Sequence, residues 1–278
     1  MTIHTAGSVS GAVQHLQRSF ARLGMRVLAA PTHLPRWGRR ASTFDIDVAR
    51  DARGEHFLIR LPEEAAPELL TLDVRPELRQ LLLLARVGER KDKFLCGFDE
   101  RHLFTAAVPG QSVRDVVGAM HALKPTPIQV SEAQLRVRGK DRLRRRNAAF
   151  IRQGEWFFAP VPDLIVPAER VRRGEPLTRG AGSKPHICAE AARLGGEPVM
   201  ACDKHRNGIS MQRYTHILKS NPKARNWNWQ SFQRNPELYV RGDIRHKDHA
   251  TLHLPMWHRV LMNTENESAG REFVAFLD

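Results

Sequence analysis

The chain has 278 residues, 41% of them hydrophobic, and its 44 lysines and arginines against 30 acidic residues give a formal net charge of +14 at pH 7. This length and apolar content are sufficient for a real core, in one large domain or two ordinary ones, and exclude an intrinsically disordered protein. Three cysteines are too few for a disulfide framework, which favours a reducing compartment. The N-terminus has no charged segment followed by an apolar one, and no apolar run approaches the length of a bilayer span. We therefore expect a cytoplasmic protein without a signal peptide or membrane contact.

The first half of the chain is expected to form a helix followed by an antiparallel meander. Val13, Leu16, Phe20 and Leu23 recur at helical spacing and predict a helix within residues 8–28. Alternating or short apolar runs predict strands at 44–48, 56–61, 69–74, 79–87, 93–98 and 102–108. A second helix is expected at 112–123, where the following prolines end it.

The second half mixes short elements with loops. We expect an aromatic strand at 155–158, an exposed loop at 170–184, a short helix at 186–194, a strand at 197–201, a helix at 210–219 and two or three strands between 238 and 263. Strand clusters with isolated helices, and no regular βαβ rhythm, predict an α+β fold of mainly antiparallel sheets. We place a domain boundary between residues 1–127 and 128–278, although a single domain also fits this pattern.

The basic charge is concentrated in the second half. Residues 1–130 carry 18 basic and 14 acidic side chains, whereas residues 131–278 carry 26 and 16. Such an excess predicts a polyanionic partner, most simply nucleic acid. The alternative is an arginine-rich composition without a dedicated partner.

Seven cations lie within residues 136–146, with Asp141 as the one acid among them. They repel one another unless an anion neutralises them, and a nucleic-acid backbone supplies phosphates at regular spacing. The alternative is a solvated surface segment. The candidate phosphate-binding residues are Arg136, Arg138, Lys140, Arg142, Arg144, Arg145 and Arg146.

Two tryptophans, Trp227 and Trp229, are separated by one residue in a polar stretch flanked by cations. In an extended segment both rings would face the same way and offer a surface on which unpaired bases stack. The alternative is that the rings fill the edge of a core, as tryptophan usually does.

Four of the 13 histidines lie within residues 246–258: His246, His249, His253 and His258. A strand over residues 248–254 would place His249 and His253 on one face. They can then act as a base and an acid on a phosphodiester, or His246, His249 and His253 can hold a divalent metal, with an aspartate as a further ligand. The third interpretation is a polar strand face without chemistry. Arg241, Arg245 and Arg259 lie nearby in the sequence and would hold substrate phosphates.

A separate spacing joins His186 and Cys188 with Cys202 and His205. Two such pairs can close a tetrahedral zinc site. The order of the ligands is unusual, and the apolar neighbours of both cysteines equally suit buried free thiols.

These features lead to one principal hypothesis and two alternatives. The chain is expected to bind nucleic acid, RNA or single-stranded DNA before duplex, and to act as a nuclease or phosphodiesterase through the C-terminal histidines. The first alternative is a metal-dependent hydrolase of another substrate. The second is a non-catalytic module of a nucleoprotein or mobile-element assembly.

Overall fold

The structure is a computed structural model that describes residues 6–31, 44–61, 67–110, 112–179 and 184–266. Its contacts divide the chain into two compact units. Unit 1 comprises residues 1–148 and 263–268, and unit 2 comprises the rest of the chain. The boundary expected after residue 127 lies after residue 148 in the structure, so the segment 128–148 belongs with the first unit. The predicted α+β class with mostly antiparallel sheets is confirmed.

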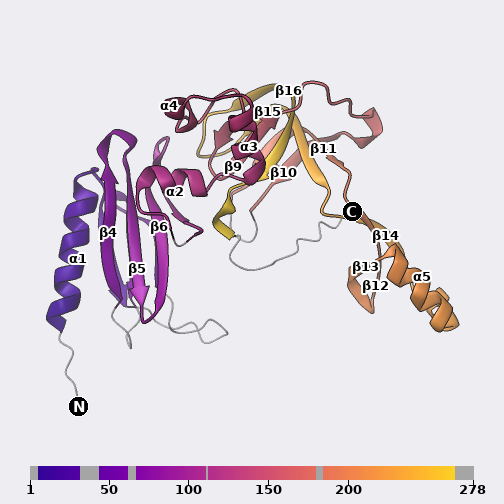
Figure 1. The fold of residues 1–278 in the computed structure, drawn as a ribbon, viewed down its shortest axis with the longest axis horizontal. Helices are drawn as coiled ribbons and strands as arrows, with labels where there is room; N and C mark the ends of the chain where they lie inside the picture. The colour runs from indigo at the N-terminus through magenta and orange to yellow at the C-terminus, as the bar shows by residue number, and fades with distance from the viewer. Residues whose placement is uncertain (1–5, 32–43, 62–66, 111, 180–183, 267–278) are drawn as a thin grey trace, which may run out of the picture. The chain divides into compact units, whose positions relative to one another are not determined.

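Unit 1 contains two sheets, and helices α1 and α2 pack against their strands (Figure 1). In a three-stranded sheet β3 lies between β1, which is parallel to it, and β2, which is antiparallel. A four-stranded antiparallel meander runs in the order β4-β5-β6-β7. The elements are α1 (Ala6–Ala21), β1 (Val27–Pro31), β2 (Asp45–Asp51), β3 (Gly54–Leu61), β4 (Glu68–Arg75), η1 (Pro76–Leu78), β5 (Gln80–Val87), β6 (Arg90–Asp99), β7 (His102–Ala107), α2 (Val116–Ala122), α3 (Thr126–Gln134), α4 (Gly139–Arg142) and η4 (Thr264–Asn266).

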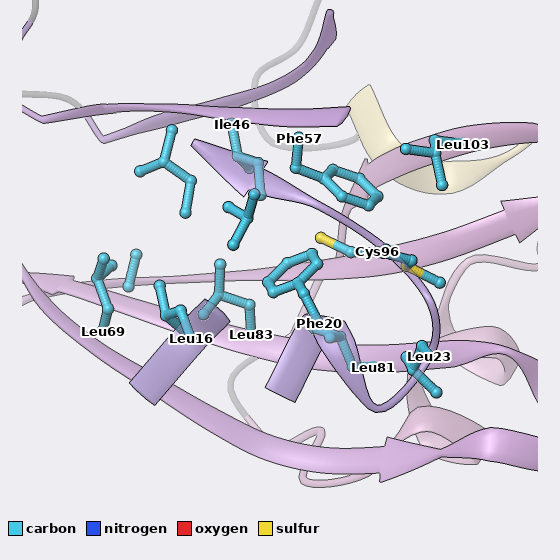
Figure 2. Close-up of a cluster of buried hydrophobic side chains, with 14 of the residues drawn as sticks. Leu16, Phe20, Leu23, Ile46, Phe57, Leu69, Leu81, Leu83, Cys96 and Leu103 are labelled. Atoms are coloured by element: carbon cyan, nitrogen blue, oxygen red, sulfur yellow. The ribbon is translucent and has the colours of Figure 1, made fainter. Parts of the chain in front are cut away.

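The continuous apolar run of β5 is explained by burial on both of its faces. Leu81 and Leu83 point into a core shared with α1 and the three-stranded sheet, where Phe20 packs against Phe57 (Figure 2). Leu82, on the opposite face, packs under α2. A strand that is covered on both sides needs no polar alternation, so its sequence is apolar throughout.

Unit 2 is built on a six-stranded antiparallel sheet in the order β10-β11-β15-β16-β9-β8. A smaller sheet, β13-β12-β14, and α5 are formed by the segment between β11 and β15. The elements are β8 (Ile151–Gln153), β9 (Trp156–Pro160), η2 (Ala168–Arg170), β10 (Arg172–Leu177), β11 (His186–Leu194), β12 (Glu197–Cys202), β13 (His205–Ser210), α5 (Met211–Ser220), η3 (Pro222–Asn226), β14 (Gln230–Arg234), β15 (Glu237–Arg245) and β16 (Leu252–Met262).

The predicted helix at 186–194 is wrong, because this segment is β11. Its alanines and Leu194 favour a helix locally, but β11 is hydrogen-bonded on both edges, to β10 and to β15. Part of the expected loop at 170–184 is likewise strand β10. Tertiary pairing has overridden local propensity at both places.

Two other predictions of local structure are confirmed. Helix α5 begins after Ser210, whose hydroxyl accepts a hydrogen bond from the Arg213 amide. The antiparallel meander of unit 1 has the strands that the alternating pattern indicated. In the described part of the chain, no helix combines the length and the apolar character that crossing a membrane requires.

Candidate metal centre

Three histidines from two segments of unit 2 meet at one end of its six-stranded sheet. His186 is the first residue of β11, and His246 directly follows β15. The two strands pair antiparallel with Ile187 opposite Arg245, so the ladder places His186 beside His246. His249 is supplied by the loop that leads from β15 to β16. We call His186, His246 and His249 the histidine triad.

The rings of the triad are close together, and the His186 ring stacks on both of the others. The ring centroids of His186 and His246 are 4.2 Å apart, those of His246 and His249 are 4.7 Å apart, and those of His186 and His249 are 5.7 Å apart. One nitrogen from each ring can be chosen such that all three lie within 4.8 Å of one another. Nitrogen ligands of a tetrahedral zinc ion are roughly 3.3 Å apart, so the three nitrogens would have to move closer to share one ion.

His186 is the buried member of the triad. Only 2% of the residue is exposed, and neither ring nitrogen has a hydrogen-bond partner among the described residues. Burial, together with the neighbouring His246 and His249, lowers the pKa of His186 to about 3. The ring is therefore neutral at physiological pH, the state in which imidazole binds a metal.

His246 is half-buried and also favours the neutral form. Burial and then His249 lower its pKa, and the Lys184 carbonyl, Asp248 and Glu155 oppose this shift only in part. Its Nε2 lies 3.3 Å from the Lys184 carbonyl, and its Nδ1 lies 3.1 Å from the amide nitrogen of Asp248. The carbonyl needs a donor, so Nε2 carries the hydrogen and Nδ1 carries the lone pair. Nδ1 is thus the nitrogen that can ligate, once the Asp248 amide moves aside.

The loop that carries His246 and His249 is held at several points. The Lys184 ammonium lies 2.5 Å from the Asp248 carboxylate. The Gln153 amide donates to the Ala250 carbonyl at 2.7 Å. A Cβ built on Gly154 would lie 3.6 Å from Nε2 of His249, so the β8–β9 turn comes close to this ring. Such outer contacts fix ligand orientation in metal sites.

The predicted strand over residues 248–254 is only partly correct. β16 begins at Leu252, and residues 246–251 form a loop, so His249 and His253 do not share a strand face. His253 is exposed and pairs with Asp243 at 2.8 Å. His258 is buried in the second half of β16, where its Nδ1 lies 2.8 Å from the Met256 carbonyl. Neither of these two histidines belongs to the triad.

The four residues of the predicted zinc spacing lie in different surroundings. Cys188 belongs to the hydrophobic core of unit 2, where burial and Glu175 raise its thiol pKa to about 12. Cys202 and His205 face each other across the β12–β13 pair. Among the described residues, only His186 of the four belongs to a group of three or more close donors. The sequence therefore identified His186 as a candidate metal ligand, but the structure groups it with His246 and His249.

The basic run at 136–146 belongs to unit 1 and is partly neutralised by the protein itself. Arg145 binds Asp99 and Glu100, and Arg138 and Arg144 both bind Asp141. The remaining cations of the run are Arg136, Lys140 and Arg146, which are exposed, and Arg142, whose Nε donates to the Val137 carbonyl at 2.9 Å.

Two of the three arginines near the histidines also form ion pairs within the protein. Arg241 binds Glu190 at 2.6 Å and lies over the Trp257 ring, and Arg259 binds Glu237 at 2.5 Å. Arg245, the last residue of β15 and the neighbour of His246, is exposed. Trp227 and Trp229 are half-buried in the segment between β11 and β15.

Comparison of the chain with protein-family models, with curated proteins and with solved structures found no match. The function is therefore argued from the residues themselves.

Proposed function

We propose that this protein is a metal-dependent hydrolase that binds one divalent transition-metal ion at the histidine triad and acts on the phosphodiester bonds of nucleic acid. The observation that carries the proposal is the state of His186. Its ring is buried, neutral and beside two further imidazoles, and neither of its nitrogens has a partner among the described residues. Buried polar atoms without partners cost free energy, so the arrangement suits a ligand that is added later.

Three imidazoles are a common donor set for catalytic zinc, which keeps a fourth position open for water. His246 and His249 are only partly buried, which leaves the site accessible from that side. A zinc ion held by these three residues would polarise a water in the open position and favour loss of its proton near neutral pH.

Glu155 is the residue that we assign to proton transfer. It lies in the β8–β9 turn, and its carboxylate is near enough to raise the pKa of His246. In this role the carboxylate would take a proton from the attacking water as the water oxygen bonds to phosphorus. The bond from phosphorus to the leaving sugar oxygen would break, and Glu155 would return the proton to that oxygen.

The net charge of +14 supports a polyanionic substrate over a neutral one. It favours nucleic acid over the small substrates of other metallohydrolases, because phosphate contacts along a polymer use many cations at once. Arg245, the residue before His246, is exposed and is our candidate for a phosphate contact.

The test begins with the metal. Purified protein is incubated with Zn²⁺, freed of excess by gel filtration and analysed for bound metal. We expect about one ion per chain in the wild type and in His253→Ala, the matched control from the same hairpin, and far less in His249→Ala. Failure of the wild type to retain metal, or equal retention in His249→Ala, would falsify the metal site.

The second part measures cleavage of labelled RNA and DNA oligonucleotides. Cleavage is expected to stop in EDTA and in His249→Ala and to persist in His253→Ala. Metal retention without cleavage of either polymer would reject the nuclease and leave a metal-dependent hydrolase of another substrate as the better hypothesis.

A further inference from the structure

A small basic module is inserted between two paired strands of unit 2. Strands β11 and β15 pair with each other, with Leu194 opposite Glu237, and the chain between them forms β12, β13, α5, η3 and β14. We call residues 197–234 the inserted module. It has two acidic residues, Glu197 and Asp203, against seven lysines and arginines: Lys204, Arg206, Arg213, Lys219, Lys223, Arg225 and Arg234.

The module gathers aromatic rings beside these cations. The rings of Trp227 and Trp229 are stacked with centroids 5.8 Å apart. His205 stacks on Trp229 at 5.7 Å, and Tyr214 meets the same ring edge-on at 4.9 Å. The Lys204 ammonium lies over the Trp227 ring, 4.1 Å from its centroid. These rings come from β13, α5 and the segment after η3, so the fold of the module, and not the sequence spacing alone, creates the cluster.

The two tryptophans have different surroundings. Trp229 is fixed in place, because its ring N–H donates to the Ala224 carbonyl at 2.8 Å and His205, Tyr214 and Trp227 contact its ring. Ala224 is itself fully buried. Trp229 therefore anchors the segment after η3.

The Lys204 ammonium covers one face of the Trp227 ring. Lys204 is exposed and reaches the ring through a flexible side chain. A base that stacks on an aromatic ring is held more strongly than an exposed ammonium over that ring. A base can therefore displace Lys204, and the displaced ammonium is then free to pair with a phosphate.

We propose that the inserted module binds an unpaired strand of nucleic acid, with a base stacked on Trp227 and with Lys204 and the exposed cations of the module on the backbone. Arg206 and Arg213 are two such exposed cations, whereas Arg234 is held by the carbonyls of Asn207 and Gly208. This inference adds to the proposed function the form of nucleic acid that is bound. It rests on the proposed function only for the choice of nucleic acid as the polymer.

The experiment titrates an oligothymidylate of 12 nucleotides into the full-length protein in EDTA and follows binding by anisotropy and by tryptophan fluorescence. Stacking quenches tryptophan emission, so wild-type fluorescence is expected to fall as the strand binds. Trp227→Leu should lose roughly 5- to 150-fold in affinity, the equivalent of about 1–3 kcal/mol, together with most of the quenching. Trp227→Phe, which keeps a ring, should retain most of the affinity.

Four controls identify the origin of any loss of affinity. Arg206→Gln with Arg213→Gln should weaken binding and its salt dependence while the quenching at saturation survives. A duplex of the same length should bind less tightly than the single strand, and polyglutamate, a polyanion without bases, should not compete. The melting temperature of Trp227→Leu should remain close to that of the wild type.

The inference is overturned if the wild type shows no quenching, or if Trp227→Leu binds the strand as tightly as the wild type does. Equal competition by polyglutamate would also reject it in favour of an acidic protein partner. All readings are made without metal and without turnover. Loss of metal binding at the histidine triad would therefore leave the measured strand binding unchanged. A negative result with Trp227→Leu would likewise leave metal retention unchanged.

Discussion

The imidazole rings of His186 and His246 stack with centroids 4.2 Å apart and an interplanar angle of 27°, at the point where the β11–β15 ladder ends. Two neutral rings in this position gain contact with each other, but the buried His186 nitrogens gain no hydrogen bond among the described residues. In a folded protein such atoms are usually satisfied by protein, water or a metal. The stacked pair is therefore the strongest reason to look for metal at this end of the sheet.

Gln153→Ala should weaken metal binding without removing a ligand. The Gln153 amide holds the loop through the Ala250 carbonyl, next to His249. Loss of an outer contact of this kind lowers metal affinity by roughly tenfold or more. Zinc competition with a chromogenic chelator measures the change. Gln129→Ala, which removes a matching 2.8 Å bond to the Lys124 carbonyl in unit 1, is the control and should leave the affinity unchanged.

Glu155→Gln should separate catalysis from metal binding. The amide is nearly the same size as the carboxylate but cannot accept the proton from water, so turnover should fall by about 10²- to 10⁴-fold. Metal content should stay near that of the wild type, because Glu155 is outside the triad. Full activity in this variant would assign the proton transfer to another group.

Lys140→Gln combined with Arg146→Gln should reduce the salt dependence of nucleic-acid binding. Both cations are exposed, and their loss should decrease the slope of log K against log salt by about 1.4 for a single strand. Arg145→Gln should behave differently and lower the melting temperature, because Arg145 binds the buried Asp99. An unchanged slope in the double variant would mean that the run is solvated surface.

Glu132→Gln should destabilise unit 1. Lys124 and Glu132 form a 2.7 Å ion pair in which the side chains are only 6% and 1% exposed, and Asn147 also donates to Glu132. Removing one charge of a buried pair leaves the other uncompensated and costs about 3–5 kcal/mol. Denaturant unfolding measures the loss. The exposed pair of Arg138 with Asp141 offers the comparison, since Arg138→Gln should cost less than about 1 kcal/mol.

His258 should make the stability of unit 2 fall in mild acid. Burial lowers its pKa, and the Met256 carbonyl opposes this shift only in part. Between its folded and unfolded pKa values the unfolded chain holds more protons, so stability rises with pH. The contribution is complete above about pH 6.5 and is lost as the pH falls toward the folded pKa. Urea unfolding from pH 7 to pH 4 should show a shallower dependence in His258→Asn, and an equal dependence would show that other groups cause the loss.

The sequence by itself determined much of unit 1. The helical spacing of Leu16 and Phe20 and the doubly buried run of β5 are local signals, because hydrophobic burial imposes its period directly on the chain. The Ser210 cap and the first strands of the meander are equally local. The sequence also singled out His246 and His249 by their density, and His186 by its place near a cysteine.

Only the tertiary structure decided how those histidines combine. His186 reaches the triad because β11 is a strand paired with β15, whereas its local composition favours a helix. His253 was excluded because the β15–β16 loop extends to Thr251, which moves His249 off the strand and leaves His253 paired with Asp243. Strand pairing between distant segments depends on the free energy of the whole sheet, and a window of neighbouring residues does not contain that information.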